Sequence, residues 1–387
     1  MQKHLDLSQL YGNEPLKTML SQAIVGGHTA HAYLLEGAAG SGKTTLSFLL
    51  AAALCCENDG ARPCRCCASC RKILRAQSPD LTVLGVDRLP FVPDGENTVD
   101  AAAAPKTKSI GVDAVRALKS DIYIKPNDLD YKLYIIGHTE RMTVQAQNAL
   151  LKLLEEPPEG AVFFLLCENR AALLPTVLSR VQRLTMEKFT DAALYELLLA
   201  HDRDAKQLAA RDDDRLRLFV RLADGAWGRA RAYLLAEPKA LAADGMYEAH
   251  EAARQCLETL FSDAMTDDSP VLGGAGAQNR RPTRTALLAQ IAGRADASAE
   301  ARERMRALLD ALCAALRDLM MCAQGVRGQL LFYPTETQPE ALSARCSSQT
   351  LMETYRALAA IRAEIDANPN VGMLQISVVN ALFALRA

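Results

Sequence analysis

The sequence has few aromatic residues, almost no net charge and no long apolar run, and each shortage excludes a class of protein. Aromatic residues make up 5% of the 387 residues and include a single tryptophan, whereas hydrophobic residues as a whole reach 49%. A chain that is apolar mainly through alanine and leucine is typical of a helix-rich globular protein of two or three domains. The formal net charge of −2 excludes a strongly basic body that binds nucleic acid over its whole surface.

Membrane and export signals are lacking as well. No apolar run approaches the roughly 18 residues that a membrane-spanning helix requires. The segment from Met1 to Asp6 has no apolar stretch of the kind found in a signal peptide. We therefore expect a soluble, cytoplasmic protein that makes no membrane contact.

Cysteine, by contrast, is abundant and unevenly distributed. Six of the eleven cysteines fall between Cys55 and Cys70, and four of them follow the spacing C-x7-C-x2-C-x2-C: Cys56, Cys64, Cys67 and Cys70. Four thiolates suit tetrahedral Zn²⁺, and a site filled entirely by sulfur is structural rather than catalytic. Cys55 is an alternative first ligand, and reactive-thiol chemistry is the alternative use of the cluster. The sequence thus predicts a zinc module at about residues 56–70.

Short apolar runs alternate with helical patterns in the first half of the chain. The runs lie at residues 32–35, 81–86, 133–136 and 162–166, and the helical patterns at 14–25, 44–56, 112–121 and 143–155. This alternation predicts a parallel sheet covered by helices on both faces. Residues 87–109 are expected to form a long surface loop, and residues 262–283 a polar connection.

After about Lys188 only helical patterns follow, including apolar stripes that begin at Met305 and Leu351. We expect three domains: an α/β domain at residues 1–188, a small helical domain at 189–244 and an all-helical domain at 245–387.

A glycine-rich segment joins the first predicted strand to the helix that follows it. Gly37-Ala38-Ala39-Gly40-Ser41-Gly42-Lys43-Thr44 matches the phosphate-loop pattern G-x-x-x-x-G-K-[ST]. The glycines let backbone N–H groups point inward at an anion, and the helix N-terminus adds its positive end. Lys43 would reach the β- and γ-phosphates of ATP or ADP, and the Thr44 hydroxyl would hold Mg²⁺. A plain glycine-rich turn is the alternative. The candidate nucleotide-binding residues are Gly37, Gly40, Ser41, Gly42, Lys43, Thr44 and Thr45.

The sequence predicts that hydrolysis is weak or absent. Hydrolysis requires an acidic residue near the end of another strand, to hold Mg²⁺ and to position the attacking water. The strand at residues 133–136 is followed instead by Gly137-His138-Thr139-Glu140. Glu140 is displaced from the strand end, and we interpret His138 as a solvated loop residue. The loop is therefore expected to bind nucleotide without efficient hydrolysis.

Two segments and the position of the cysteines carry a resemblance to a known family. His31-Ala32-Tyr33-Leu34 before the phosphate loop, the cysteine module directly after the loop helix, and the segment Asn148-Ala149-Leu150-Leu151-Lys152-Leu153-Leu154-Glu155-Glu156-Pro157-Pro158 resemble the clamp-loader branch of the AAA+ family. The resemblance implies an α/β P-loop domain with a parallel sheet, followed by a helical lid and an all-α collar. The spacing found in the family favours Cys56 over Cys55 as the first zinc ligand.

The resemblance also suggests a role for one arginine. Leu178-Ser179-Arg180-Val181 is similar to the family's Ser-Arg-Cys motif, with Val181 in place of the cysteine. In the family this arginine projects into the ATP site of a neighbouring subunit, so Arg180 is the candidate arginine finger in trans. A surface ion pair at a helix end is the alternative role.

Within the family, two branches compete. Motor subunits of the gamma/tau type keep Asp-Glu after the strand, whereas delta-prime subunits commonly lose it and often resemble Ile-Ile-x-His-x-x-x-Met-Thr, as residues 135–143 do. The absence of a long tau-type tail after Ala387 also favours the delta-prime branch. That branch implies an accessory subunit of a hetero-oligomeric ring with gamma/tau and delta subunits, which loads the sliding clamp on primer-template DNA during replication. An active motor ATPase and a P-loop transferase of small molecules are the rival hypotheses.

Overall fold

The computed structural model describes residues 4–92, 109–261, 287, 291, 299–326, 328, 330–365 and 371–386. It divides the chain into two compact units: Met1–Leu194 with Asp224–Arg229, and Tyr195–Ala223 with Ala230–Ala387. Most of the predicted surface loop and the predicted polar connection lie outside the described residues. The predicted division into three domains stays a prediction.

The first unit is built on a five-stranded sheet in which every pair of neighbouring strands is parallel. The strand order is β4-β5-β6-β2-β7, with bounds β2 (Ala32–Glu36), β4 (Leu81–Leu84), β5 (Lys132–Ile136), β6 (Ala161–Cys167) and β7 (Gln182–Thr185). The predicted parallel sheet is confirmed. Strand β7 was not expected, because three of its four residues are polar and only Leu184 is buried.

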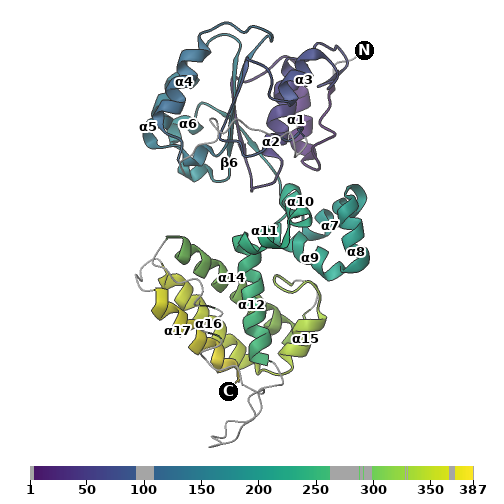
Figure 1. The fold of residues 1–387 in the computed structure, drawn as a ribbon, viewed down its shortest axis with the longest axis vertical. Helices are drawn as coiled ribbons and strands as arrows, with labels where there is room; N and C mark the ends of the chain where they lie inside the picture. The colour runs from purple at the N-terminus through teal and green to yellow at the C-terminus, as the bar shows by residue number, and fades with distance from the viewer. Residues whose placement is uncertain are drawn as a thin grey trace, which may run out of the picture. The chain divides into compact units, whose positions relative to one another are not determined.

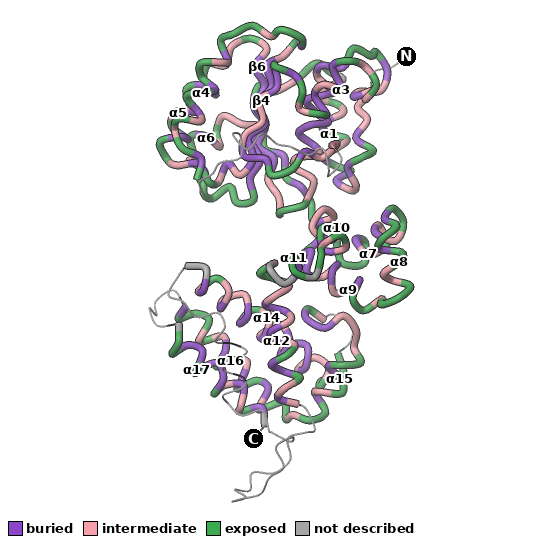
Figure 2. Tube along the Cα trace, viewed as in Figure 1, coloured by how far each residue is buried: buried purple, intermediate pink, exposed green. Residues whose placement is uncertain are grey.

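Helices cover both faces of this sheet (Figure 1). One face carries α1 (Glu14–Val25), α2 (Lys43–Leu54) and α3 (Ala68–Leu74), and the other carries α4 (Val112–Ile122), α5 (Val144–Glu155) and α6 (Pro175–Leu178). Successive side chains of a strand point to opposite faces, so Tyr33 and Leu35 join the core under α2, whereas Ala32 and Leu34 join the core under α4 and α5. The central strands β5 and β6 are consequently buried along their length (Figure 2).

Short elements complete the first unit. A separate two-stranded parallel ladder pairs β1 (His4–Leu5) with β3 (Ala61–Arg62). Two 3-10 turns follow strands at the carboxyl edge of the main sheet: η2 (Thr139–Arg141) after β5 and η3 (Arg170–Ala172) after β6. Helix α5 begins where the Thr143 side chain accepts a hydrogen bond from the Ala146 N–H at 3.2 Å.

In its described residues, the second unit is helical. Helix α7 (Asp191–His201) leads into it and α10 (Trp227–Leu235) re-enters it, and the other elements are α8 (Arg203–Arg211), α9 (Asp213–Leu222), α11 (Pro238–Ala243), α12 (Gly245–Phe261), α14 (Ala299–Ala323), α15 (Thr337–Ser343), α16 (Ser348–Glu364), α17 (Val371–Phe383) and η4 (Ala384–Arg386). The predicted stripe that begins at Met305 lies on α14 and is buried against α12 and α16. Among the described residues, no helix is both long and apolar enough to cross a membrane.

Candidate nucleotide and metal sites

The phosphate loop lies at the carboxyl end of β2 and runs into α2, as the sequence predicts. Gly40 and Gly42 adopt φ angles of 75° and 97°, a region that residues with a Cβ rarely occupy. The Gly40 carbonyl accepts a hydrogen bond from the Gly228 N–H at 2.8 Å. A Cβ on Gly40 would lie 2.5 Å from the Arg229 backbone nitrogen. This close approach therefore requires glycine at position 40.

Lys43 is folded into the loop. Its ammonium donates hydrogen bonds to the carbonyl oxygens of Gly37 at 2.6 Å and Ala38 at 2.8 Å. Burial lowers the pKa of Lys43, and the nearby carboxylates of Glu168 and Glu140 oppose that shift. The buried Ser41 hydroxyl has no hydrogen-bond partner among the described residues. A phosphate in the loop would supply the acceptor that this hydroxyl lacks, so these residues fit a bound nucleotide.

A cavity of about 200 Å³ opens beside the loop. Six of the predicted nucleotide-binding residues line it, from Gly40 to Thr45, while Gly37 lies beneath the loop against Met186. The opposite wall is largely apolar and includes Tyr11, Phe189 and Trp227, with the Tyr11 and Trp227 rings 4.6 Å apart and tilted by 52°. An anion-binding loop beside an aromatic wall suits a nucleoside phosphate. This wall was not predicted from the sequence, although the single tryptophan of an aromatic-poor chain was a usable signal.

A second cavity of about 210 Å³ lies on the other side of Lys43 and Thr44. His138 lines it, and our interpretation of this residue as solvated is wrong, because its side chain is only 20% exposed. Its Nε2 lies 2.9 Å from Asp87 Oδ2 and its Nδ1 3.4 Å from Glu140 Oε1. The hydrogen bonds to Glu140 and to Asp87 both raise the pKa of His138, against the opposing effect of burial.

Glu140 enters the same cavity from η2. Burial alone would raise the pKa of Glu140, but hydrogen bonds from His138 and from the Glu168 N–H outweigh it and lower the pKa. The position directly after β5 is closed to an acid, because a Cβ on Gly137 would lie 2.2 Å from the Gly85 carbonyl oxygen. The carboxylate that faces Lys43 and Thr44 therefore comes from the turn rather than from the strand end.

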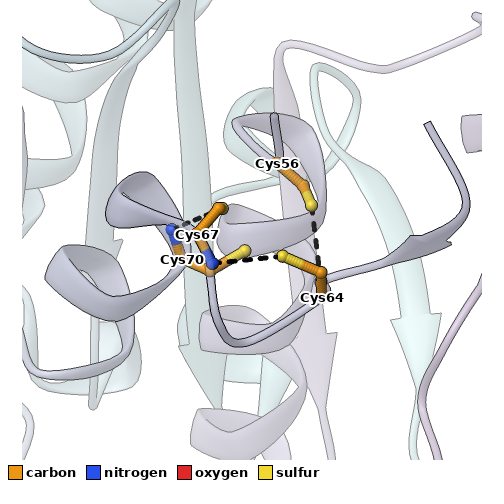
Figure 3. A group of neighbouring side chains, drawn as sticks. All are labelled: Cys56, Cys64, Cys67 and Cys70. Carbon is orange, nitrogen blue, oxygen red and sulfur yellow. Dashed lines mark hydrogen bonds between the residues drawn. The ribbon is translucent and has the colours of Figure 1, made fainter. Parts of the chain in front are cut away.

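The four predicted zinc cysteines lie together between α2 and α3 (Figure 3). The sulfur atoms of Cys56, Cys64, Cys67 and Cys70 lie within 4.8 Å of one another. Tetrahedral Zn–S bonds of about 2.3 Å require sulfur separations of about 3.8 Å, so small rotations would suffice for binding. Backbone N–H groups of Cys64, Cys67 and Cys70 donate to the sulfurs of Cys56, Cys64 and Cys67 at 3.3–3.4 Å. The cluster thus fits a structural zinc ion.

The remaining cysteines of this segment differ in their surroundings. Burial raises the pKa of the Cys55 thiol to about 12, and Cys66 is exposed. Burial would also raise the pKa of Cys64, but hydrogen bonds from the N–H groups of Cys67 and Cys66 lower it to about 6. The thiolate, which is the form that binds metals, is therefore favoured at Cys64 and disfavoured at Cys55.

Arg180 lies just after α6 and pairs with residues of α5 and α6 in its own chain. Its guanidinium is 2.8 Å from Glu155 Oε1 at the end of α5 and donates to the Thr176 carbonyl at 3.0 Å. Arg180 is not one of the described residues that line the two cavities. Within a single chain this residue makes the surface ion pair that was the alternative interpretation, and its side chain is 36% exposed.

Comparisons with known proteins agree with this set of features. A family model described as "DNA polymerase III, delta subunit" matches residues 12–190. The chain is 33% identical over 184 residues to DNA polymerase III subunit delta' of Bacillus subtilis, covering 48% of this chain and 50% of that protein. It is 31% identical over 215 residues to the tau subunit of the same organism, and the match covers 55% of this chain and 34% of the tau subunit.

Solved structures give a looser comparison. A gamma subunit-related protein of Thermotoga maritima covers 96% of this chain and 99% of its own at 18% identity, with a TM-score of 0.37, which is too low to bear on function. The chain spans half or less of the length of the curated relatives named above. The matched region holds the phosphate loop, the cysteine cluster and the segment Asn148–Pro158. Over residues 12–190, the chain is therefore similar to clamp-loader subunits of DNA polymerase III.

Proposed function

We propose that this protein is a delta-prime-type subunit of a bacterial clamp loader, which binds ATP or ADP but hydrolyses it slowly or not at all. The observation that carries the proposal is the close contact between Gly137 and Gly85, which leaves no room for an acid directly after β5. A motor subunit needs that acid to hold Mg²⁺ and the attacking water. The match to the delta' relative over half its length supports this branch.

Nucleotide would bind with its phosphates in the loop and its base against the aromatic wall. Lys43 would exchange its bonds to the Gly37 and Ala38 carbonyls for phosphate oxygens, and the Ser41 and Thr44 hydroxyls would contact phosphate and Mg²⁺. Lys43 would then bond to anionic phosphate oxygens instead of neutral carbonyls, and the Ser41 hydroxyl would gain the acceptor that it lacks. A bound nucleotide would therefore stabilise the first unit whether or not it is hydrolysed.

Arg180 would act in trans on the ATP site of a neighbouring gamma/tau subunit. Its ion pair with Glu155 joins two partly exposed side chains, and such pairs contribute about 0–1 kcal/mol. A neighbouring phosphate would readily displace Glu155. The guanidinium would then stabilise charge that develops on the transferred phosphoryl group.

The similarity to clamp-loader subunits supports a proposal for the assembly. We propose a hetero-oligomeric ring with gamma/tau and delta subunits, held together by the C-terminal helices, that loads the sliding clamp on primer-template DNA in replication. The cysteine cluster would bind one structural Zn²⁺ through Cys56, Cys64, Cys67 and Cys70. In that role zinc ties the end of α2 to the start of α3.

A gamma/tau-type motor ATPase is the second candidate, and one observation favours it. The Glu140 carboxylate shares a cavity with Lys43 and Thr44, so an acid is present near the phosphate loop although not at the strand end. The two candidates differ in the ATPase rate of the isolated chain.

Nucleotide binding is tested through Trp227, which is the only tryptophan and lines the cavity. We expect ATP and ADP to change its fluorescence in a saturable way, and Lys43→Ala to weaken this response at least tenfold, about 1.4 kcal/mol. Lys17→Ala, which removes a half-buried lysine that pairs with Glu14 on α1, is the matched control. A response that survives Lys43→Ala unchanged would contradict binding in the loop.

The subunit role is tested by ATPase assays of the chain alone and of the complex with gamma/tau and delta. We expect the chain alone to be inactive and Arg180→Ala to slow the affected site of the complex by about 10³-fold. Arg183→Ala, which removes an exposed arginine of β7, should leave the rate unchanged. Rapid hydrolysis by the chain alone would establish the motor alternative.

A further inference from the structure

Four neighbouring strands bring chemically active side chains to one edge of the sheet. Asp87 follows β4, His138 and Glu140 follow β5, Glu168 follows β6, and the phosphate loop follows β2. These strands are adjacent in the order β4-β5-β6-β2. Because all are parallel, their carboxyl ends meet at the same edge, where ligands of such sheets bind. The second cavity is lined from this edge.

Three of these side chains have the spacing of a metal site. One ring nitrogen of His138 and one carboxylate oxygen each from Glu140 and Glu168 lie within 4.8 Å of one another. A divalent transition metal bound at about 2.0–2.2 Å from each donor needs donor separations of about 3–3.5 Å. Side-chain rotation alone would close the remaining gap, since Glu168 is exposed.

The hydrogen bonds around His138 hold it in the orientation of a ligand. Its Nε2 faces Asp87 Oδ2 at 2.9 Å, and its Nδ1 faces Glu140. A carboxylate on one ring nitrogen is the partner that metal-binding histidines generally have, because it places the proton there and leaves a lone pair on the other nitrogen. The backbone of His138 adopts φ 49° and ψ 45°, a left-handed conformation that residues with a Cβ rarely adopt and that clusters at functional sites.

We propose that His138, Glu140 and Glu168 bind one divalent transition-metal ion, with Mn²⁺ preferred over Mg²⁺, whether or not nucleotide is present. An imidazole nitrogen suits first-row transition metals, whereas Mg²⁺ is bound almost entirely through oxygen. The ion would also neutralise part of the negative charge of three carboxylates, those of Asp87, Glu140 and Glu168. These carboxylates share the cavity with the cations Lys43 and Arg88. This site is distinct from the cysteine cluster, whose sulfur donors suit zinc rather than manganese.

The test uses the full chain with zinc bound and measures Mn²⁺ binding by electron paramagnetic resonance without nucleotide. We expect one equivalent of Mn²⁺ per chain, displaced by Mg²⁺ only at concentrations at least about tenfold higher. His138→Gln should weaken Mn²⁺ binding at least about tenfold and reduce the preference for Mn²⁺ over Mg²⁺. Asp87→Asn, at an 83% exposed position where folding is not at risk, should weaken Mn²⁺ binding about 10-fold through the ring nitrogen it orients.

Glu36→Gln is the matched control. It removes the same charge at the end of β2, where the carboxylate pairs with Arg170 at 3.1 Å and lies outside the three-residue cluster. At moderate ionic strength it should change Mn²⁺ binding by less than about twofold. Equal losses in Glu36→Gln and Glu140→Gln would overturn the proposal in favour of diffuse attraction.

Two further results would overturn it: no Mn²⁺ binding at millimolar concentration, or a preference for Mn²⁺ that His138→Gln leaves unchanged. Trp227 fluorescence in the same samples reports nucleotide binding separately. A failed metal site therefore leaves the proposed nucleotide site intact, and the reverse also holds.

Discussion

The carboxylate of Asp80, just before β4, is 1% exposed and holds a loop in place. It accepts hydrogen bonds from the backbone N–H groups of Asn127, Asp128 and Leu129 at 2.6–3.0 Å, and Lys132 Nζ lies 3.9 Å away. Burial alone would raise the pKa of Asp80, but these hydrogen bonds outweigh it and lower the pKa. The charged form is therefore stabilised in the folded state.

Asp80 should make stability depend on pH in the acid range. Its folded pKa lies below the unfolded value of about 3.9, so its contribution is present above pH 4 and is lost as the pH falls below that value. Asp80→Asn should lower the free energy of unfolding at pH 7 by about 2–4 kcal/mol and flatten its decline in acid. Urea unfolding at pH 7 and at pH 3.5 measures both. Asp113→Asn, at an exposed carboxylate, should leave both unchanged.

Gly40 should tolerate no side chain. Gly40→Ala places a Cβ 2.5 Å from the Arg229 nitrogen at a φ of 75°, so we expect a loss of about 1–3 kcal/mol in stability and a weaker Trp227 response to ATP. Gly27→Ala is the control, because Gly27 has a similar φ of 73° and open space around it. If the two variants unfold alike, only backbone strain matters and the contact with Arg229 does not.

At the scale of elements, the cysteine module lies where the end of α2 meets α3, and Cys70, Ile73 and Leu74 of α3 share a core with α2. The module is also tied to the N-terminal segment by the β1–β3 ladder and by the Arg65–Asp6 ion pair at 2.6 Å. Metal binding in such modules contributes folding free energy directly.

Removing one ligand should therefore release zinc and destabilise the module. Cys64→Ser should lose about one equivalent of zinc per chain and lower the melting temperature by several degrees, since a loss of 1 kcal/mol shifts Tm by about 2–4 °C in a domain of this size. Cys66 is an exposed cysteine directly before Cys67. The Cys66→Ser variant should keep its zinc. Elemental analysis with calorimetry checks both, and zinc retained in Cys64→Ser would contradict the ligand assignment.

At the scale of the whole molecule, the chain has two compact units, and the residues that line both nucleotide-site cavities belong to the first. A ligand that binds only the folded form stabilises the unit that holds it. The second unit has its own core, in which the buried carboxylate of Asp318 accepts backbone hydrogen bonds from Leu331, Phe332 and Tyr333 at 2.7–3.1 Å.

Nucleotide should consequently act on one of two unfolding transitions. At a concentration of 100 times Kd, ATP should add about 2.7 kcal/mol to the stability of the first unit and leave the second transition in place. Scanning calorimetry with and without ATP measures this, and Lys43→Ala should abolish the shift. A single transition that moves as a whole would show that the two units unfold together.

Features encoded in short contiguous segments were predictable from the sequence. The phosphate loop spans residues 37–44 and the cysteine spacing residues 56–70, and each strand or helix of the alternation is a similarly short segment. Local geometry depends on such local patterns. The short strand β7 was missed because its polar residues make no apolar run. These local patterns determined the fold class and the candidate loop and zinc residues.

Only the tertiary structure decided which distant residues share a site. His138 appeared solvated because nothing near it in sequence shows that Asp87 lies beside it, and Trp227 joins Tyr11 only once the segment after α9 reaches the loop. In the sequence, Gly137 shows only that the acidic residue after the strand is missing. In the structure, its contact with Gly85 shows that an acidic side chain would not fit at this position. These contacts follow from the strand order β4-β5-β6-β2-β7, in which neighbours in space are far apart in the chain. The sequence by itself therefore determined the local binding elements, and the three-dimensional packing of separate segments determined what surrounds them.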